Sequence, residues 1–316
     1  MLNENIKFVV VTRQTALEEL VQKYNTLEQA RFYITHLGED FEMYQTQHQR
    51  YYQSLEETLR AINQFGKFQK LDRRYLPNFI FGEKDIIVVV GQDGLVANTM
   101  KYLENQKIIA VNPDKKLWDG ILLPFEPESI KKLLPEVIRG KRNVKEITMA
   151  KAVLTDGQCL YAVNDLFIGP KSHTSARYRL NFDNISEEQS SSGIIISTGL
   201  GSTGWLKSIM CGALGITKKV ENFQDSFLER NNYILPNLAW NSKSLIFSVR
   251  EPFPSKNSTS ECIFGEIKEN KPLTIVSKMP ENGVIFSDGI ESDFLAFSSG
   301  MQASITIADR VGHLVV

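Results

Sequence analysis

Gly91, Gln92, Asp93 and Gly94 form a short turn between an apolar run and a segment with helical character. Two glycines allow backbone N–H groups to approach a phosphate closely, and the start of a helix adds donors and a positive dipole. A carboxylate beside a phosphate is repelled unless it accepts a proton from an attacking hydroxyl or helps to hold a cation. The turn therefore favours phosphoryl transfer, although a purely structural turn can have the same sequence.

A second glycine-rich segment, Gly199 to Gly204, reads GLGSTG and contains a GxGxxG pattern. A P-loop requires Lys and then Ser or Thr directly after the last glycine, where this chain has Trp205 and Leu206. A dinucleotide fingerprint requires a strand ending in an acidic residue about 20 residues further on, and Lys218 to Asn222 shows no strand pattern. Hydroxyls beside glycine amides still suit phosphate or ribose oxygens.

Asn164 and Asp165 follow the apolar run Leu160 to Val163. An amide next to a carboxylate is well suited to the two hydroxyls of a ribose. The same pair is also typical of an Asx turn, and Asp288-Gly289 is most simply a hairpin turn. The residues alone leave both interpretations of the pair open.

The elements that must position these residues differ between the two halves of the chain. Ile6 to Val11 and Asp85 to Val90 are nearly continuous apolar runs, typical of strands covered on both faces. A capping box begins at Thr15, and apolar residues recur at helical spacing from Phe41 to Ile62. This alternation predicts a Rossmann-like parallel sheet with helices over residues 1–142, and it puts the first glycine turn where open α/β sheets bind ligands.

Residues 143–316 show a different pattern of short β-branched runs separated by Gly, Asn, Asp and Pro. This pattern predicts a mainly antiparallel β domain, with a C-terminal tail that can pack back on the first domain. The expected strands are Ala152 to Thr155, Leu160 to Val163, Ala176 to Phe182, Ile194 to Ser197, Leu245 to Val249, Leu273 to Ser277 and Ser304 to Ile307.

The composition is that of an ordinary globular protein and excludes several classes. Lys plus Arg number 36 against 37 Asp plus Glu, so no overall positive field favours nucleic acid or an anionic membrane. The 3 cysteines and 4 histidines form no metal-binding spacing, and we predict no protein-built metal site. No apolar run reaches the ~18 residues of a membrane-spanning helix. The expected location is cytoplasmic.

Taken in order, these segments resemble the NAD kinase family, whose members carry a Gly-Gly-Asp-Gly turn, an Asn-Glu pair and a Thr-Gly-Ser-Thr loop. The corresponding segments here are Gly91 to Gly94, Asn164-Asp165 and Gly201-Ser202-Thr203. The mitochondrial-type branch is the most similar. That likeness lies in the segments Asn164 to Gly169, Ser191 to Gly193 and Phe247 to Pro252.

The resemblance implies ATP-dependent phosphorylation of the 2′-hydroxyl of the adenosine ribose of NAD, with Mg²⁺ carried by the nucleotide. It makes Asp93 the general base. It assigns the ATP phosphates to Gly91, Gln92, Gly94, Gly201 and Ser202, and it assigns NAD to Asn164, Asp165, Thr203, Gly204, Trp205 and Ser208. The expected partners are these two small molecules and further copies of the chain, in a homodimer or a larger homo-oligomer.

Four departures from the family pattern affect these expectations. Gln92 replaces a glycine, so its side chain could narrow the space through which a phosphate approaches or require another backbone conformation. Asp165 replaces a glutamate, Ser192 stands where many members have an aspartate, and Trp205 replaces a tyrosine. The alternatives are a related kinase for a sugar, lipid or nucleoside hydroxyl, a non-catalytic nucleotide-binding protein, and an NAD-linked oxidoreductase suggested by GxGxxG alone.

Overall fold

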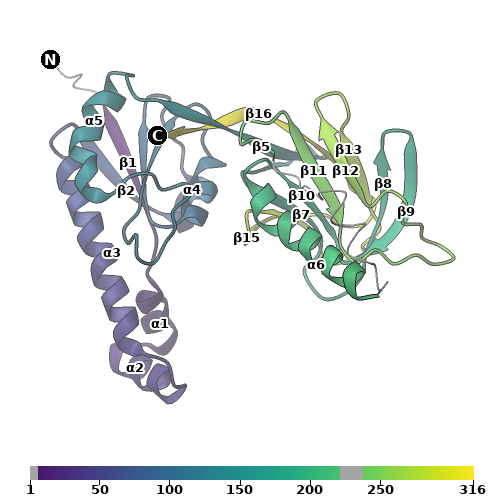
Figure 1. Cartoon of the computed structure of the whole chain (residues 1–316), viewed down its shortest axis with the longest axis horizontal. Coiled ribbons are helices and arrows are strands. Elements are labelled where there is room, and N and C mark those ends of the chain that lie inside the picture. The colour runs from purple at the N-terminus through teal and green to yellow at the C-terminus, as the bar shows by residue number, and fades with distance from the viewer. Residues whose placement is uncertain (1–5, 221–237) are drawn as a thin grey trace. The chain divides into compact units, whose positions relative to one another are not determined.

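The computed structural model describes residues 6–220 and 238–316 and divides into two compact units (Figure 1). The first unit comprises Met1–Lys145 and His313–Val316, and the second comprises Glu146–Gly312. Within the described residues, no helix combines the length and apolar character needed to cross a membrane.

A parallel sheet forms the centre of the first unit, in the order β2-β1-β3-β4. The end of a long last strand extends the sheet, because His313 and Leu314 pair in parallel with β4. The strands β1 and β3 are almost wholly buried, which explains their continuous apolar sequence. The bounds are β1 (Lys7–Thr12), β2 (Lys67–Asp72), β3 (Ile86–Val90), β4 (Lys107–Val111) and β16 (Gln302–Val315).

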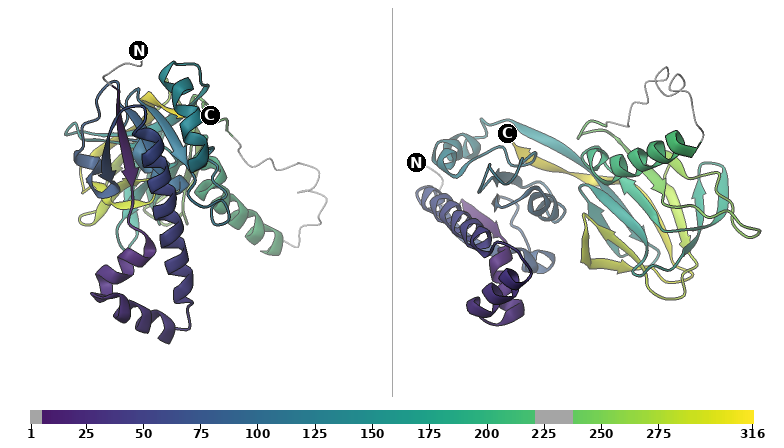
Figure 2. Two further views of the ribbon diagram at one scale, coloured as in Figure 1. Left: turned by 90° about the vertical axis from the view of Figure 1, so that its left-hand side faces the viewer. Right: turned by 60° about the horizontal axis from the view of Figure 1, so that its bottom comes forward.

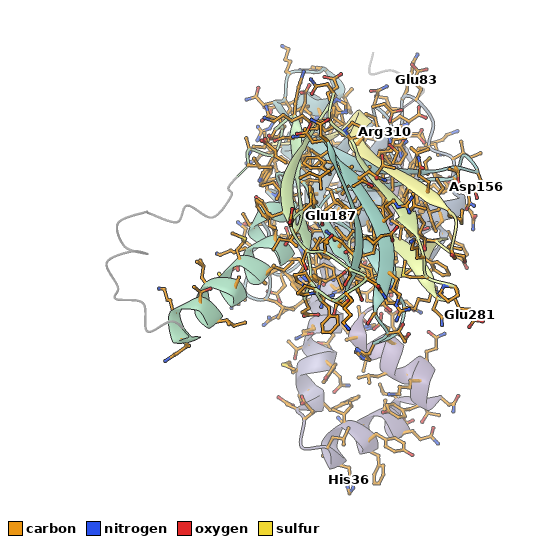
Figure 3. The ribbon with its side chains drawn as sticks, turned by 90° about the vertical axis from the view of Figure 1, so that its right-hand side faces the viewer. His36, Glu83, Asp156, Glu187, Glu281 and Arg310 are labelled. Carbon is orange, nitrogen blue, oxygen red and sulfur yellow. The ribbon has the colours of Figure 1, made fainter. Side chains whose placement is uncertain are left out.

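Helices cover this sheet and extend beyond it. The expected capping box is present at Thr15, whose hydroxyl accepts a hydrogen bond from the Glu18 backbone and starts α1 (Ala16–Tyr24). α3 (Phe41–Ile62) packs with α5 (Ile130–Ile138) on the core of the sheet. His36 ends α2 (Leu27–His36), at the far end of the helical extension (Figure 3). The short helix α4 (Asp93–Met100) follows β3 directly.

The second unit contains two antiparallel sheets with a hydrophobic core between them. Apolar side chains of both sheets alternate into this core, as in the pattern of β8. One sheet has the order β12 (Phe264–Lys268), β11 (Ser244–Val249), β10 (Ile194–Ser197), β7 (Asp165–Pro170), β14 (Gly283–Ser287) and β15 (Ile290–Ala296). The other includes β16, β13 (Leu273–Ser277), β8 (Ala176–Phe182) and β9 (Ile185–Ser191), with β5 (Val144–Leu154) and β6 (Cys159–Ala162) beside them.

One helix of the second unit covers the other face of the six-stranded sheet. α6 (Trp205–Val220) packs there through Trp205 and Ile209, against Phe167, Ile195 and Val284 (Figure 2). The predicted fold class, an α/β part followed by a mainly antiparallel β part, is confirmed.

Candidate functional site

The Asn164-Asp165 pair is held in place by a distant side chain. The Asp288 carboxylate accepts hydrogen bonds from the backbone N–H groups of Val163 at 3.1 Å, Asn164 at 2.6 Å and Asp165 at 3.3 Å. The Asp288 N–H in turn donates to the Asp165 carbonyl at 2.9 Å. Asp288 does lie in a hairpin turn, with φ of 54°, but its side chain also fixes the backbone of the pair.

Asp165 is the first residue of β7, and its carboxylate is electrostatically unusual. Part of the residue is exposed, but Oδ1 is buried and has no hydrogen-bond partner among the described residues. Burial raises the pKa of Asp165 to about 7, and the nearby Asp288 charge adds to this, while a hydrogen bond from Ser197 opposes it. Leaving a buried polar atom unpaired costs free energy, so this oxygen is suited to a donor from a ligand.

The glycine-rich loop lies directly against this pair. A Cβ atom on Gly201 would come within 2.2 Å of the Asn164 carbonyl oxygen and 2.8 Å of Asp165 Oδ1, so only glycine fits there. Thr198 joins the same cluster, because its hydroxyl donates to Val163 O at 2.6 Å and its N–H to Asn164 O at 2.9 Å. Two sequence-predicted segments that lie far apart in the chain therefore form one site.

The hydroxyl groups of the loop already donate within the loop. Ser202 donates to Gly199 O at 2.8 Å, and it is buried with 3% of its surface exposed. Thr203 and Ser208 likewise donate to carbonyl oxygens of Leu200 and Gly204, each at 3.3 Å. The lone pairs of these hydroxyls can still accept hydrogen bonds from a ligand.

The loop does not occupy a dinucleotide-binding βαβ unit. It follows β10, which is antiparallel to both of its neighbours, and leads into α6. Residues 218–220 belong to this helix, and residues 221 and 222 lie outside the described residues. The GxGxxG pattern is thus a local loop sequence and gives no support to the oxidoreductase alternative.

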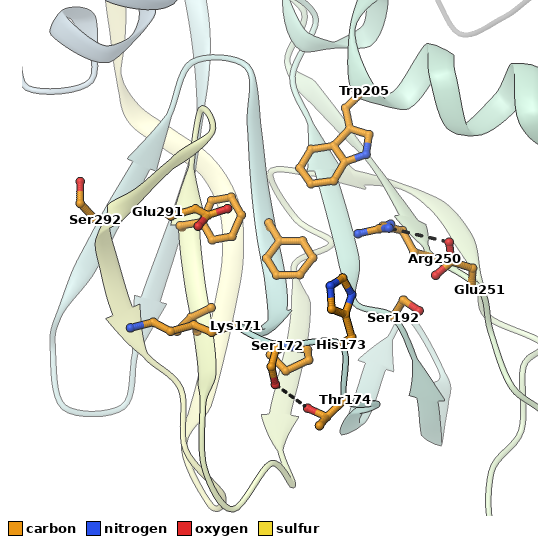
Figure 4. A pocket seen from close by; sticks show the side chains of 14 residues that line it. Lys171, Ser172, His173, Thr174, Ser192, Trp205, Arg250, Glu251, Glu291 and Ser292 are labelled. Atoms are coloured by element: carbon orange, nitrogen blue, oxygen red, sulfur yellow. Dashed lines mark hydrogen bonds and ion pairs between the residues drawn. The ribbon is translucent and has the colours of Figure 1, made fainter. Parts of the chain in front are cut away.

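Trp205 borders a pocket of about 660 Å³ on the face of the six-stranded sheet covered by α6 (Figure 4). Its indole stacks on Phe167 at 5.9 Å between ring centroids, and the Arg250 guanidinium lies 5.5 Å from the indole. Lys171 and His173 also line the pocket. Aromatic faces with cations beside them suit a flat ring that carries anionic groups. Sequence reasoning missed Phe167, Lys171 and Arg250, because neither residue type nor local spacing distinguishes them.

The other glycine turn, in the first unit, has ordinary backbone geometry. Gln92 has φ −109° and ψ 166°, extended values that any residue adopts, so the replacement of glycine causes no strain. A Cβ atom on Gly91 would meet Leu95 Cδ2 at 2.8 Å, whereas Gly94 is exposed. Asp93 begins α4, and its Oδ1 accepts a hydrogen bond from the Leu122 N–H at 2.6 Å.

Sequence comparison gives a partial match. No family model matches the chain. Over 132 residues the chain is 30% identical to the NAD kinase of Buchnera aphidicola subsp. Schizaphis graminum, a match that covers 38% of this chain and 43% of that protein. Over this segment the chain is similar to an NAD kinase. The matched part is less than half of the relative's length, so the relative's activity is not carried over by this match alone.

Solved NAD kinase structures share the fold over nearly the whole chain. A yeast NADH kinase complexed with NADH matches 98% of this chain and 83% of its own, with a TM-score of 0.57 and 14% identity. An NAD kinase from Archaeoglobus fulgidus in complex with ATP matches 98% of this chain and 94% of its own, with a TM-score of 0.58 and 15% identity. At these identities the likeness establishes the NAD kinase fold.

Proposed function

We propose that the chain transfers a phosphoryl group from ATP to the 2′-hydroxyl of the adenosine ribose of NAD. The observation that carries the proposal is the buried Oδ1 of Asp165, which lies beside Asn164 and Gly201 and has no hydrogen-bond partner in the described part of the chain. Adjacent ribose hydroxyls supply the donors that this oxygen lacks, and the Asn164 amide can both donate and accept. The relation to the NAD kinases supports the same assignment.

The acceptor nucleotide is assigned to the second unit. Asn164 and Asp165 bind its ribose hydroxyls, Thr203 and Gly204 belong to the adjoining loop, and Ser208 lies in the first turn of α6. Trp205 provides an aromatic surface for a base in the neighbouring pocket. The tryptophan retains the aromatic face of the tyrosine that it replaces and loses only the hydroxyl.

The donor phosphates are assigned to Gly91, Gln92 and Gly94, together with Gly201 and Ser202. Asp93 is the proposed general base. Its hydrogen bond from Leu122 N–H fixes the orientation of the carboxylate, and the second oxygen can accept the proton of the attacking hydroxyl. Fixed groups of this kind catalyse phosphoryl transfer mainly by positioning.

Mg²⁺ is proposed to arrive with ATP. The described residues contain no group of three or more His, Cys, Asp or Glu side chains that could hold a metal ion. The balanced charge and the cysteine spacing support a cytoplasmic protein. Assembly into a homo-oligomer and membership of the mitochondrial-type branch remain part of the same proposal.

The direct test is to incubate the purified chain with Mg·ATP and either NAD or NADH, and to identify the products by mass. Formation of NADP or NADPH is expected. In calorimetry, Asp165→Ala should weaken the binding of the dinucleotide far more than the binding of ATP. Glu281→Gln, in an exposed turn of the same unit, is the matched control (Figure 3). Phosphorylation of a different hydroxyl, or nucleotide binding without turnover, would contradict the proposal and favour one of the alternatives.

A further inference from the structure

The parallel sheet of the first unit has a topological switch point between β1 and β3. The chain continues from β1 to β2 on one side and from β3 to β4 on the other. Open α/β sheets bind ligands outside the carboxyl ends of strands at such a point. The register pairs Val11 with Val89, so Arg13 and Gly91 each lie two residues beyond the same pair.

Arg13 brings a half-buried positive charge to this edge, and the exposed Glu19 is the carboxylate that acts on it electrostatically. Its backbone N–H donates to the Tyr51 hydroxyl at 3.1 Å, and its guanidinium lies 5.8 Å from the centroid of the Trp118 ring. Its Nε is buried and has no hydrogen-bond partner among the described residues. A buried donor of a charged group is costly to leave unpaired, so an anion would stabilise it.

A pocket of about 130 Å³ lies beside this guanidinium. Its lining includes Thr15, Trp118 and one face of α3, on which Tyr44, His48 and Tyr51 recur at helical spacing. At ~30 Å³ for each water, the pocket holds about four waters. This volume accommodates one phosphate group.

The carboxylates near the pocket already have partners. Asp114 forms an ion pair with Arg50 at 2.8 Å and accepts the Lys116 N–H at 3.0 Å. Glu18 accepts hydrogen bonds from the Thr15 N–H at 2.7 Å and the Tyr52 hydroxyl at 2.6 Å. Glu18 thereby occupies the N-terminus of α1, which leaves Arg13 as the group that an anion would meet.

One loop connects this pocket with the candidate general base. The loop follows β4, and the Asn112 side chain fixes it by donating to Trp118 O at 3.1 Å. Trp118 lies against Arg13, and a few residues later Leu122 donates its N–H to Asp93. The arginine, the loop and the glycine turn therefore lie along the same carboxyl edge.

We propose that the pocket between Arg13 and Trp118 is a phosphate-binding subsite in which the guanidinium binds one phosphate group. The identity of this phosphate rests on the proposed kinase function. We assign it to the donor ATP, because the subsite shares its sheet edge with the turn assigned to that nucleotide. Phosphates of NAD are the other source of the same chemistry, and the experiment separates the two.

The test is calorimetric titration of the full chain with inorganic tripolyphosphate, ATP and NAD separately. Arg13→Gln should weaken the binding of tripolyphosphate and of ATP roughly tenfold or more, because a charge-assisted hydrogen bond is lost. NAD affinity should change less than about twofold. Arg31→Gln removes an exposed arginine of α2 that pairs with Glu42, and this control should change nothing.

Trp118 supplies a second readout. Tripolyphosphate should change the intrinsic fluorescence of the protein, and Trp118→Phe should remove most of that change. If Arg13→Gln does not fold, Arg13→Lys replaces it, because lysine keeps the charge and loses the planar fork. A several-fold loss of tripolyphosphate affinity is then expected.

Equal tripolyphosphate affinity in the wild type and the arginine variants would overturn the subsite, as would failure of the wild type to bind tripolyphosphate. Weaker binding of NAD alone would overturn the assignment of the subsite to the donor nucleotide.

Tripolyphosphate binding requires no turnover, so failure of the subsite and failure of the proposed function can be distinguished. A chain that binds through Arg13 but makes no NADP retains the subsite and loses the proposed function. A chain that makes NADP with an unchanged KM for ATP in Arg13→Gln loses only the subsite.

Discussion

Asp93 and Asp165 carry the two halves of the proposed chemistry, and their surroundings differ sharply. Asp93 follows ordinary extended backbone, and its Oδ1 is satisfied by the Leu122 N–H at 2.6 Å. Asp165 has a buried Oδ1 without a hydrogen-bond partner among residues 6–220 and 238–316, and burial raises the pKa of this carboxyl to about 7. The turn with the more distinctive sequence therefore holds the carboxylate whose Oδ1 already has a partner. The pair that could have been a simple Asx turn carries the stronger physical signal of a ligand site.

The difference suggests a division of work. A satisfied carboxylate is held ready in one orientation, as a proton acceptor requires. An unsatisfied carboxylate destabilises the free protein and recovers that free energy when a ligand donates to it. Substitutions at the two positions should therefore separate turnover from binding and stability.

The largest effect is expected from Asp93→Asn. The variant keeps the volume and one oxygen for the Leu122 N–H but cannot accept a proton, so kcat should fall about 10²- to 10⁴-fold. NAD affinity and the melting temperature should stay close to wild type. Steady-state NADP formation and calorimetry measure the two effects, with the exposed Asp119→Asn as control. Wild-type turnover in Asp93→Asn would remove Asp93 from the mechanism.

The next largest effect is expected from Asp288→Ala. This change removes the acceptor for the backbone N–H groups of residues 163–165, which are then left unpaired. Unfolding free energy should fall by roughly 2 to 4 kcal/mol, and NAD affinity should fall with it. Asp288→Asn keeps one acceptor oxygen and should lose less stability than Asp288→Ala. Denaturant unfolding at pH 8 measures the stability of both variants. An unchanged NAD affinity in a destabilised Asp288→Ala would show that the Asn164-Asp165 pair does not bind the acceptor nucleotide.

The fold was predictable where the pattern is local. The helix predicted from Phe41 to Ile62 and the strands Ala176 to Phe182 and Leu273 to Ser277 have those bounds in the structure, because their apolar spacing reflects a single buried face. The edge strand β9 was missed because its sequence ISEEQSS is polar. β7 was missed because its first residues resemble a turn, and α6 because a glycine loop precedes it.

The residue types of the site could be predicted from the sequence, but the distant residues that contact them could not. The glycines, Asn164 and Asp165 are recognisable in sequence. Asp288 holds that pair across more than 120 residues of chain, and Arg250, directly after β11, reaches Trp205 at the start of α6. Such contacts depend on the register of strands that are distant in sequence, so no local pattern encodes them.

The third prediction concerns the pH dependence of stability. The native pKa of Asp165, about 7, lies above the ordinary value near 3.9 of an unfolded chain. The native state therefore binds the proton more tightly than the unfolded chain does. The stability gained from this proton is fully present below pH ~4 and is lost as the pH rises to ~7, and above that pH it no longer changes. Asp165→Asn should match the stability of wild type at pH 4 and exceed it at pH 8 by up to roughly 4 kcal/mol.

The same variant should bind NAD about tenfold more weakly at pH 8, because a carboxylate acceptor is lost. Thermal unfolding at pH 4, 6 and 8 gives the stability profile, and Glu281→Gln, exposed in the same unit, should follow wild type throughout. A stability difference between wild type and Asp165→Asn that does not change with pH would show that this carboxyl titrates normally.

The smallest effect is expected at Gln92, where the chain departs most from the family turn. Gln92 has extended backbone and caps α4 without a side-chain hydrogen bond, so its side chain is not needed for the geometry. Glycine is also an acceptable N-cap residue. Gln92→Gly should thus keep NADP formation within about tenfold of wild type, no more than ~1.4 kcal/mol of transition-state stabilisation. NADP formation by the two proteins is compared at saturating Mg·ATP and NAD. An inactive wild type with an active Gln92→Gly would mean that this chain binds nucleotides without phosphorylating NAD, because the glutamine side chain blocks the approach of the phosphate.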